Sequence, residues 1–254
     1  MVGISVVINT YNAALHLEKV LESVKDFDEI LICDMHSSDS TLEIAKKYHC
    51  NIIFHEKISF VEPARNFAIQ SAKNDWVLLL DADEVITSDL KAKLYQFKNN
   101  QEGNTALAIP RKNYFLGKWM RAAYPDYVYR FFRKDSIVWP PFIHSKPEIS
   151  GKVVKISPQE KNLALEHLAD DSISVILEKN NTYSTAEIAK RKGKKVSFGK
   201  LIYSPFFWFF KYYVIKKGFL DGKEGLIFAT LKAQYKFNTL AKIIESETKK
   251  KKIS

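Results

Sequence analysis

The sequence has few cysteines and no apolar run long enough to cross a membrane. Neither Cys33 nor Cys50 lies in a metal-type spacing, and Cys33 falls within an apolar strand pattern, so we expect buried thiols in a reducing compartment. The longest apolar stretch of the C-terminal region, 201–210, is interrupted by a serine and a proline and falls well short of the roughly 20 residues that span a bilayer. The N-terminus has no charged region ahead of its short apolar run, which argues against a signal peptide. A cytosolic protein is therefore predicted.

Glycine is also scarce, with nine residues in 254, and none of them builds a phosphate-binding loop. Neither the GxGxxG pattern of dinucleotide-binding folds nor the GxxxxGK[ST] pattern of P-loop enzymes occurs. These absences argue against a hydride-transfer enzyme and against an ATPase. They also disfavour sugar-1-phosphate nucleotidyl transfer, a chemistry that uses a glycine-rich, basic N-terminal loop to hold a triphosphate.

Acidic residues are in the minority, because 39 lysines and arginines stand against 29 aspartates and glutamates, and the formal net charge is +10. Such a balance indicates an anionic partner: nucleic acid, an acidic membrane surface or a phosphorylated substrate. The basic excess lies in the C-terminal third, in KRKGKK from Lys190, in Lys216 and Lys217, and in KKKK from Lys249. It is therefore predicted to belong to an appendage rather than to the first half of the chain.

Strand-like and helix-like segments alternate through the first half of the chain. Apolar runs at 3–10, 29–34, 51–56 and 75–81 read as strands, and periodic segments at 14–24, 40–48 and 62–72 read as helices. This alternation predicts an α/β domain with a mainly parallel sheet. Polar loops at 9–12, 34–38 and 81–84 follow three of the strands, so they are expected to line one crevice at the carboxyl edge of the sheet.

The stretch WVLLLDADEV, from Trp76 to Val85, ends a buried strand in three carboxylates. Crowded like charges raise one another's pKa, so the cluster is costly unless positive charge neutralises it. A metal ion, an ion-pair network and a helix cap are the three explanations. Ser88 and Asp89 already supply caps for the helix that follows, which favours a functional role for Asp81, Asp83 and Glu84.

The rest of the chain divides into an aromatic segment and a helical one. Residues 110–151 are rich in rings and are expected to be irregular, forming a substrate wall, the second half of the core, or both. Helical patterns follow at 172–192, 200–219 and 224–247, so we predict a catalytic domain over 1–168 and a helical extension over 169–254. The middle helix combines a short apolar face with flanking lysines, which predicts either a helix lying on a membrane or a helix packed on the catalytic domain.

Taken in order, several motifs resemble those of the inverting family 2 glycosyltransferases of the GT-A fold. Within that family the sequence is most similar to the lipopolysaccharide core β-1,4-glucosyltransferase branch. The motifs are ISVVINTYN, EILICDMHSSDST, EPARNFAIQSAKNDWVLLLDADE, YPDYVYRFFR, LEHL and GFLDGKEGLIFA, which together cover most of the chain. The resemblance implies a Rossmann-like, mainly parallel sheet with helices on both faces, followed by an α-helical C-terminal extension.

The resemblance also implies a metal site. Asp83 would bind Mn²⁺ or Mg²⁺ directly, because hard cations take oxygen ligands and leave room for phosphate oxygens. Asp81 would meet the ribose or a metal-bound water. His167 would complete the metal or diphosphate site, and its alternative is a structural histidine.

A nucleotide site is implied in the same way. Asp34 would accept a hydrogen bond from the uracil imide, with Thr10 and Asn12 beside the base or ribose. The alternative for Asp34 is a turn residue that closes DMHSSDS. Arg65 would face the crevice as a partner of phosphate or of Asp81, and its alternative is an ion pair on the helix surface.

The catalytic base is assigned to Asp126, because relatives carry an aspartate a few residues before an arginine-containing strand and Asp126 precedes Arg130 by four positions. His144 and Glu148 are reserves. In the most similar branch an acid follows the histidine, whereas Ser145 stands there in this sequence.

These assignments predict an enzyme that transfers a hexose, with glucose the first choice, from a UDP-sugar to a saccharide acceptor of a bacterial surface glycan or lipopolysaccharide core. A single displacement with inversion is expected, and the acceptor is free or lipid-linked. The location is cytoplasmic, at the inner face of the cytoplasmic membrane if the helical extension binds anionic lipid, and no nucleic acid partner is expected. The rival prediction is a non-catalytic basic module that binds an acidic membrane or nucleic acid.

Overall fold

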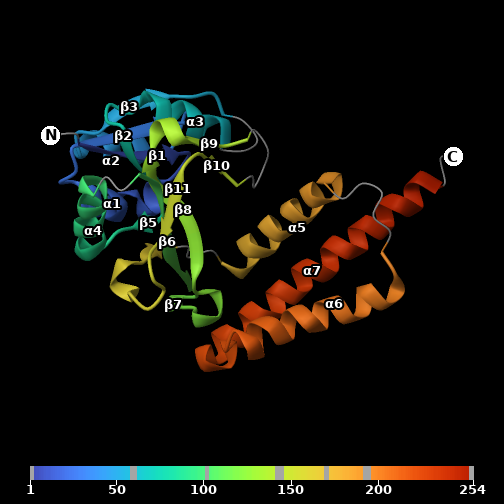
Figure 1. The fold of residues 1–254 in the computed structure, drawn as a ribbon. Helices are drawn as coiled ribbons and strands as arrows, with labels where there is room; N and C mark the ends of the chain where they lie inside the picture. Colours follow the sequence, from blue (N-terminus) through green and yellow to red (C-terminus); the bar gives the residue numbers. More distant parts are fainter. Residues whose placement is uncertain are drawn as a thin grey trace. The chain divides into compact units, whose positions relative to one another are not determined.

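The computed structural model describes residues 3–57, 62–100, 103–140, 146–168, 172–190 and 196–251. The chain forms two compact units, coloured by sequence in Figure 1. The α/β unit holds residues 1–112 and 125–168, and the helical unit holds 113–124 and 169–254. Residues 113–124 therefore belong with the C-terminal helices, which no sequence feature indicated. The division into a catalytic domain over 1–168 and a helical extension over 169–254 stays a prediction.

The α/β unit is built on one large sheet with the strand order β3-β2-β1-β4-β8-β6-β12-β5. Its first four strands run parallel and are β1 (Ile4–Thr10), β2 (Glu29–Asp34), β3 (Asn51–Phe54) and β4 (Trp76–Asp81). Antiparallel pairing follows, with β8 (Asp126–Arg133) between β4 and β6 (Asn104–Phe115), and β12 (Leu165–His167) beside β5 (Glu84–Val85).

The other strands of the described residues are short. β11 (Lys152–Lys155) pairs parallel with β6, and β7 (Lys118–Trp119) pairs antiparallel with it. A separate two-stranded sheet joins β9 (Ile137–Val138) to β10 (Glu148–Ile149). Short 3-10 turns lie at Arg121–Ala123, Lys134–Ser136 and Lys161–Leu163.

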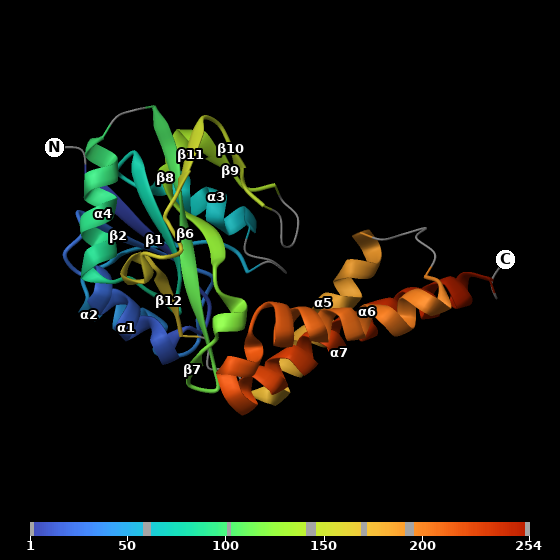
Figure 2. The same cartoon turned by 60° about the horizontal axis from the view of Figure 1, so that its bottom comes forward.

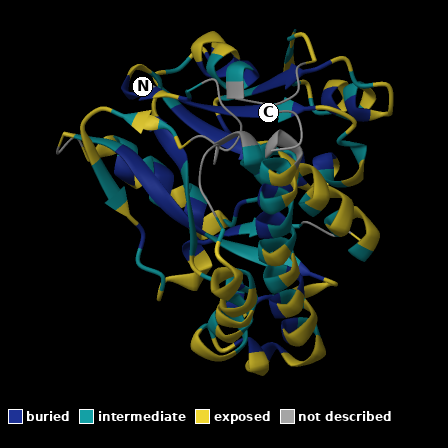
Figure 3. Ribbon diagram, turned by 90° about the vertical axis from the view of Figure 1, so that its right-hand side faces the viewer, coloured by how far each residue is buried: buried dark blue, intermediate teal, exposed yellow. Residues whose placement is uncertain are grey.

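Helices cover both faces of the large sheet, as the sequence predicted (Figure 2). Val6 and Ile8 of β1 pack on the side of α1 (Ala14–Val24), α2 (Thr41–Lys47) and α4 (Ser88–Asn99), whereas Val7 packs on the side of α3 (Glu62–Ser71). Successive side chains of a strand point to opposite faces, so a strand covered on both sides must be apolar throughout. The central strands are accordingly buried, and they are dark blue in Figure 3.

Two details differ from the sequence-based expectations. The described part of the segment 110–151 is not irregular, because it contains the end of β6 and all of β8, with Pro110 opposite Tyr127 in the ladder. Proline suits an extended backbone and removes only one donor, so it did not end the strand.

The cap of α4 is Thr87, whose Oγ1 accepts a hydrogen bond from the Leu90 amide at 3.1 Å, and Ser88 and Asp89 form the first turn instead. Asp83 and Glu84 are still not needed as caps.

The helical unit contains α5 (Ile173–Lys190), α6 (Phe198–Phe210) and α7 (Gly222–Lys251). A π-helical turn, Lys211–Ile215, extends α6, and a 3-10 turn, Gly218–Asp221, leads into α7. α7 packs along both α5 and α6. At the turn, a Cβ on Gly225 would lie 1.9 Å from the Gly218 carbonyl oxygen, so only glycine permits this approach. None of the helices within the described ranges is long and apolar enough to cross a membrane.

Candidate active site

The carboxyl ends of the parallel strands bring three polar loops to one edge of the sheet. The register places Asn9 of β1 level with Cys33 of β2 and with Asp81 of β4. The first two loops are joined directly, because the Asn12 amide donates to Ser37 Oγ and Asn12 Oδ1 accepts from the Ser38 amide, each at 2.9 Å. Asn12 holds a φ of 47°, a left-handed conformation that asparagine tolerates better than most residues. The predicted crevice loops therefore lie together.

Asp34 is buried and fully engaged with its neighbours. Its carboxylate accepts hydrogen bonds from Thr10 Oγ1 at 2.7 Å, from the Ser37 amide at 2.8 Å and from Ser37 Oγ at 2.6 Å. Neither Asp34 nor Thr10 has more than 1% of its surface exposed. This geometry matches the turn alternative for Asp34. The uracil contact of Asp34 stays a prediction.

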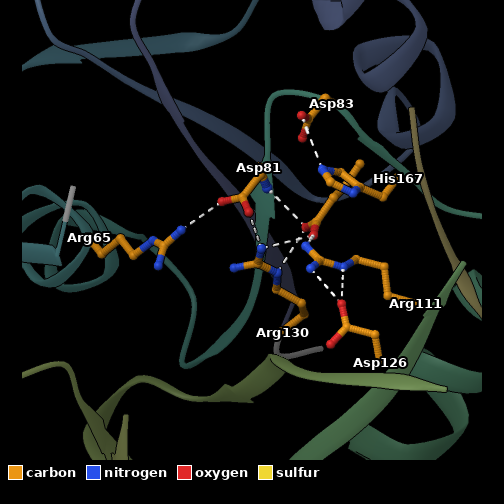
Figure 4. Close-up of polar contacts among 8 residues, drawn as sticks. Arg65, Asp81, Asp83, Arg111, Asp126, Arg130 and His167 are labelled. Carbon is orange, nitrogen blue, oxygen red and sulfur yellow. Dashed lines mark hydrogen bonds and ion pairs between the residues drawn. The ribbon is translucent and has the colours of Figure 1, made fainter. Parts of the chain in front are cut away.

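Arginine side chains neutralise the carboxylate of Asp81 at the end of β4 (Figure 4). Arg65 of α3 lies 2.8 Å from Asp81 Oδ1, and Arg130 of β8 contacts Asp81 Oδ2. Arg65 also lies over the Trp139 ring, 5.9 Å from its centroid. Both oxygens of Asp81 are thus held by guanidinium groups from two different elements.

Glu84 lies at the centre of the network. Its side chain has no exposed surface and accepts hydrogen bonds from Arg130 Nη2 at 2.9 Å and from Arg111 Nη1 at 2.8 Å. The Asp81 amide donates to Glu84 Oε2 at 3.1 Å. Arg111 continues the chain to Asp126, with Nη2 2.6 Å and Nε 3.1 Å from the same carboxylate oxygen. Three arginines and three carboxylates therefore alternate across the site.

The network shifts the pKa values of its members in the directions that pairing predicts. Burial raises the pKa of Asp81, but Arg130, Arg65 and Arg111 lower it more, so the net pKa is well below the usual range. Burial lowers the pKa of Arg130, and Asp81 and Glu84 raise it above its ordinary value. Both groups therefore stay charged at neutral pH.

Asp83 stands apart from the arginines and faces His167. Its Oδ2 lies 3.3 Å from His167 Nε2, and its backbone oxygen accepts from the Leu168 amide at 2.8 Å. The antiparallel pairing of β12 with β5 sets His167 level with Glu84 and so brings it to Asp83. Burial raises the pKa of Asp83, but the hydrogen bond and charge of His167 lower it more, so it lies below the usual value. The sequence-predicted metal ligands are thus neighbours.

Asp83 also has a buried oxygen with no partner. Oδ1 has almost no exposed surface and receives no hydrogen bond from the described residues. A buried polar atom of this kind is costly unless something binds it, and a carboxylate oxygen beside an imidazole suits a divalent cation. No group of three or more potential protein ligands occurs within the part of the chain that the structure describes. The donor set therefore fits a cation that takes its remaining oxygens from another molecule.

The three candidates for the base fall in different places. Asp126 lies at the site, with 40% of its side chain exposed and one oxygen held by Arg111. Glu148 is exposed on β10, in the separate two-stranded sheet. His144 lies outside the described residues. Of the two described candidates, Asp126 is joined through Arg111 to Glu84.

Sequence reasoning gave Glu84 a functional role but missed its arginine partners, Arg111 and Arg130. Two signals were available. Asp126 and Arg130 lie on one strand, and three adjacent carboxylates call for cations nearby. The cross-strand position of Arg111 opposite Asp126 depends on the β6–β8 register, which no local pattern gave.

Comparison with known proteins assigns the class. Residues 5–146 match the family described as Glycosyl transferase family 2. This match covers more than half of the chain, so the protein belongs to glycosyl transferase family 2. The α/β fold, with three polar loops at the carboxyl edge of its parallel strands, is the GT-A fold predicted from the motifs.

Individual relatives agree with this class. An uncharacterized glycosyltransferase of Rickettsia felis is 29% identical over 275 residues, which is 100% of this chain and 93% of the relative. The lipopolysaccharide core biosynthesis glycosyltransferase LpsC of Rhizobium meliloti is 27% identical, over 92% of this chain and 89% of LpsC. The structure of the mannosyltransferase PcManGT from Pyrobaculum calidifontis, in complex with GDP-Man and Mn²⁺, superposes with a TM-score of 0.59 at 10% identity, over 96% of this chain and 88% of that one. This last likeness concerns the fold alone.

Proposed function

We propose that the protein transfers a hexose, with glucose the first choice, from a UDP-sugar to a saccharide of a bacterial surface glycan, with inversion. The observation that carries this proposal is the Asp83–His167 pair, in which Asp83 Oδ1 receives no hydrogen bond from the described residues, close to the arginines that hold Asp81 and Glu84. A sugar nucleotide brings a diphosphate, and its departure needs positive charge at the leaving group. The site offers both a cation position and fixed guanidinium groups.

A divalent cation, Mn²⁺ or Mg²⁺, would be held by Asp83 and His167 and would supply positive charge to the leaving diphosphate. Two protein ligands make a weak site alone, so the cation and the nucleotide are expected to bind together. The Mn²⁺ in the PcManGT complex supports the choice of metal class. Arg65, whose side chain remains partly exposed, lies beside Asp81 where it can also meet phosphate oxygens.

Asp126 would take the proton from the acceptor hydroxyl. In a single displacement that oxygen attacks the anomeric carbon as the bond to the nucleoside diphosphate breaks, which inverts the configuration. Arg111 holds one oxygen of Asp126 through two nitrogen atoms and so fixes the carboxylate, while the side chain keeps an exposed surface. A carboxylate that is both fixed and reachable suits a general base.

The acceptor class is inferred from relatives. LpsC is named for lipopolysaccharide core biosynthesis, and its alignment spans nearly all of this chain. A saccharide of a bacterial surface glycan or lipopolysaccharide core is therefore the proposed acceptor. The alternative, a non-catalytic basic module, does not explain why Asp83 keeps a buried oxygen unpaired at the sheet edge.

A donor screen tests the proposal. Purified protein is offered UDP-glucose, other UDP-hexoses and GDP-mannose, with Mn²⁺ or with EDTA, and release of nucleoside diphosphate is measured with a saccharide acceptor. We expect release from a UDP-hexose that requires metal and is lost in Asp83→Asn. Asp26→Asn, which changes an exposed surface aspartate of the same unit, is the matched control. Nucleotide release from GDP-mannose alone would contradict the UDP assignment, and no turnover with any donor would favour the binding module.

A further inference from the structure

The helix α6 exposes a row of large apolar side chains to solvent. Phe198, Ile202, Phe206 and Phe210 recur every four residues, and their exposed fractions are 77%, 47%, 72% and 51%. Val214, in the π-helical turn, continues the same row. Residues spaced by four lie on one side of a helix, so they form a continuous apolar stripe.

Two further rings widen this stripe. Tyr203 and Phe207 are 60% and 51% exposed and lie one turn apart beside it. We call the surface made by Phe198, Ile202, Tyr203, Phe206, Phe207 and Phe210 the α6 face. An ordinary surface helix turns its apolar stripe toward the core and its polar side toward water. In α6 large apolar residues face solvent, whereas Ser204, 6% exposed, is the buried residue of the helix.

Lysines are frequent in α6 and in the segments next to it. Residues 198–237 contain seven lysines against Asp221 and Glu224, a formal excess of +5, and Asp221 is itself buried. Lys200, Lys217 and Lys223 are exposed. Two more, Lys211 and Lys236, lie over the Trp208 ring at 4.6 and 4.8 Å from its centroid. The α6 face therefore has exposed lysines next to it in α6 and in the adjoining segments, and we call these lysines its basic border.

We propose that the α6 face binds the surface of a bilayer that contains anionic phospholipid. An apolar face bordered by lysines matches acyl chains and headgroups at the same time, and such a helix lies in the plane of the interface. The described helices cannot cross the bilayer, so the contact is peripheral. The proposal uses residues of the helical unit alone and does not depend on the proposed transfer reaction.

Two other occupants fit the same residues less well. Nucleic acid would use rings as stacking platforms, but Ile202 and Val214 have no π face for a base. A second copy of the chain would bring two basic borders together in a symmetric interface, where like charges repel. The surface of a bilayer with anionic lipid complements both the exposed rings and the lysines.

Vesicle flotation with the whole protein tests the proposal. The probes are phosphatidylcholine vesicles with and without phosphatidylglycerol, at low and at high salt. We expect the protein to float with the anionic vesicles at low salt, to remain behind with the neutral ones, and to be released by salt because screening weakens the lysine attraction.

Two pairs of variants separate the apolar and the charged contributions. Phe206→Ser combined with Phe210→Ser should lower vesicle binding by about tenfold or more. Leu15→Ser combined with Val138→Ser changes similarly exposed apolar residues of the α/β unit and should leave vesicle binding unchanged. Lys216→Glu with Lys217→Glu should also lower it by about tenfold or more, whereas Lys19→Glu with Lys46→Glu on α1 and α2 should change it little. The serine and glutamate changes fall on exposed or partly exposed side chains, and circular dichroism checks that each variant is folded.

Three results would overturn the proposal. The intact protein remaining unbound to anionic vesicles at low salt is the first. Equal binding to neutral vesicles, unaffected by the lysine changes, is the second. The third is a dimer in sedimentation velocity that the phenylalanine changes dissociate without any vesicle binding, which would assign the α6 face to a second copy. Donor turnover is not part of any of these readouts, so failure here leaves the proposed reaction untouched.

Discussion

Arg130 and Glu84 form a buried ion pair, with Arg130 Nε 2.8 Å from Glu84 Oε2 and 6% and 0% of the two side chains exposed. Removing one partner of such a pair leaves the other charge uncompensated in a medium that solvates it poorly. Glu84→Gln keeps the shape of the side chain and removes its charge, while Arg111 and Arg130 both lose an anionic partner. We expect the free energy of unfolding to fall by about 3 kcal/mol, measured by urea denaturation. Glu160→Gln, at an exposed position, is the control, and an equal small change in both variants would contradict the role given to Glu84.

Removal of the proposed base should separate catalysis from donor binding. In Asp126→Asn we expect turnover to fall by about 10²-fold or more, because general base catalysis typically contributes that much, while UDP affinity stays nearly unchanged. Steady-state kinetics and calorimetry measure the two quantities. Glu148→Gln and His144→Ala are the comparison variants. If either of these loses turnover while Asp126→Asn keeps it, the base lies in the segment of His144 and Glu148 instead.

Acid should destabilise the fold through Asp81. Its pKa in the folded protein lies well below the value of about 3.9 for an unfolded aspartate. Its contribution is therefore complete above the unfolded value and is lost as the pH falls toward the folded one, because only the unfolded chain takes up the proton in between. Urea midpoints measured from pH 6 to pH 3 should fall steeply below about pH 4.5. In Asp81→Asn the slope should be shallower, and an identical slope in the two proteins would contradict the pairing.

Both thiols should be slow to react in the folded protein. Burial raises the pKa of Cys33 to about 11 and that of Cys50 to about 11, so at pH 8 about one thiol in a thousand is ionised. We expect modification by a disulfide reagent at pH 8 to be slow in buffer and fast in denaturant. Rapid labelling of the native protein at either position would show that the thiol is more accessible than this structure makes it.

Local patterns predicted the parallel half of the sheet well, and the physical reason is visible in its strands. Apolar runs such as 4–10 and 76–81 are buried on both faces, and polar residues follow where each strand ends, so composition alone marked both the strand and the edge. The antiparallel half was harder to predict. Pro110 and the many rings suggested an irregular segment, and the pairing of β6 with β8 depends on contacts between residues far apart in sequence.

The site residues also divide into those that local motifs predicted and those that depend on contacts between distant parts of the chain. Asp81, Asp83, Arg65 and His167 stood out in motifs, and the structure places Arg65 beside Asp81 and His167 beside Asp83. The hydrogen bonds that close around Asp34 were predicted only as an alternative. Arg111 and Glu84 could not be paired from the sequence, because their contact joins positions 27 residues apart through the fold of the sheet.

The most direct measurement of the central claim is calorimetry of UDP binding with Mn²⁺ and with EDTA, on the wild-type protein and on Asp83→Ala. If Asp83 and His167 hold the cation together with the diphosphate, Mn²⁺ should tighten UDP binding in the wild type by tenfold or more, roughly the effect of a metal site that is completed by its ligand. In Asp83→Ala the affinity with Mn²⁺ should fall to the value seen in EDTA. Equal UDP affinity in Mn²⁺ and in EDTA for the wild-type protein would contradict the account.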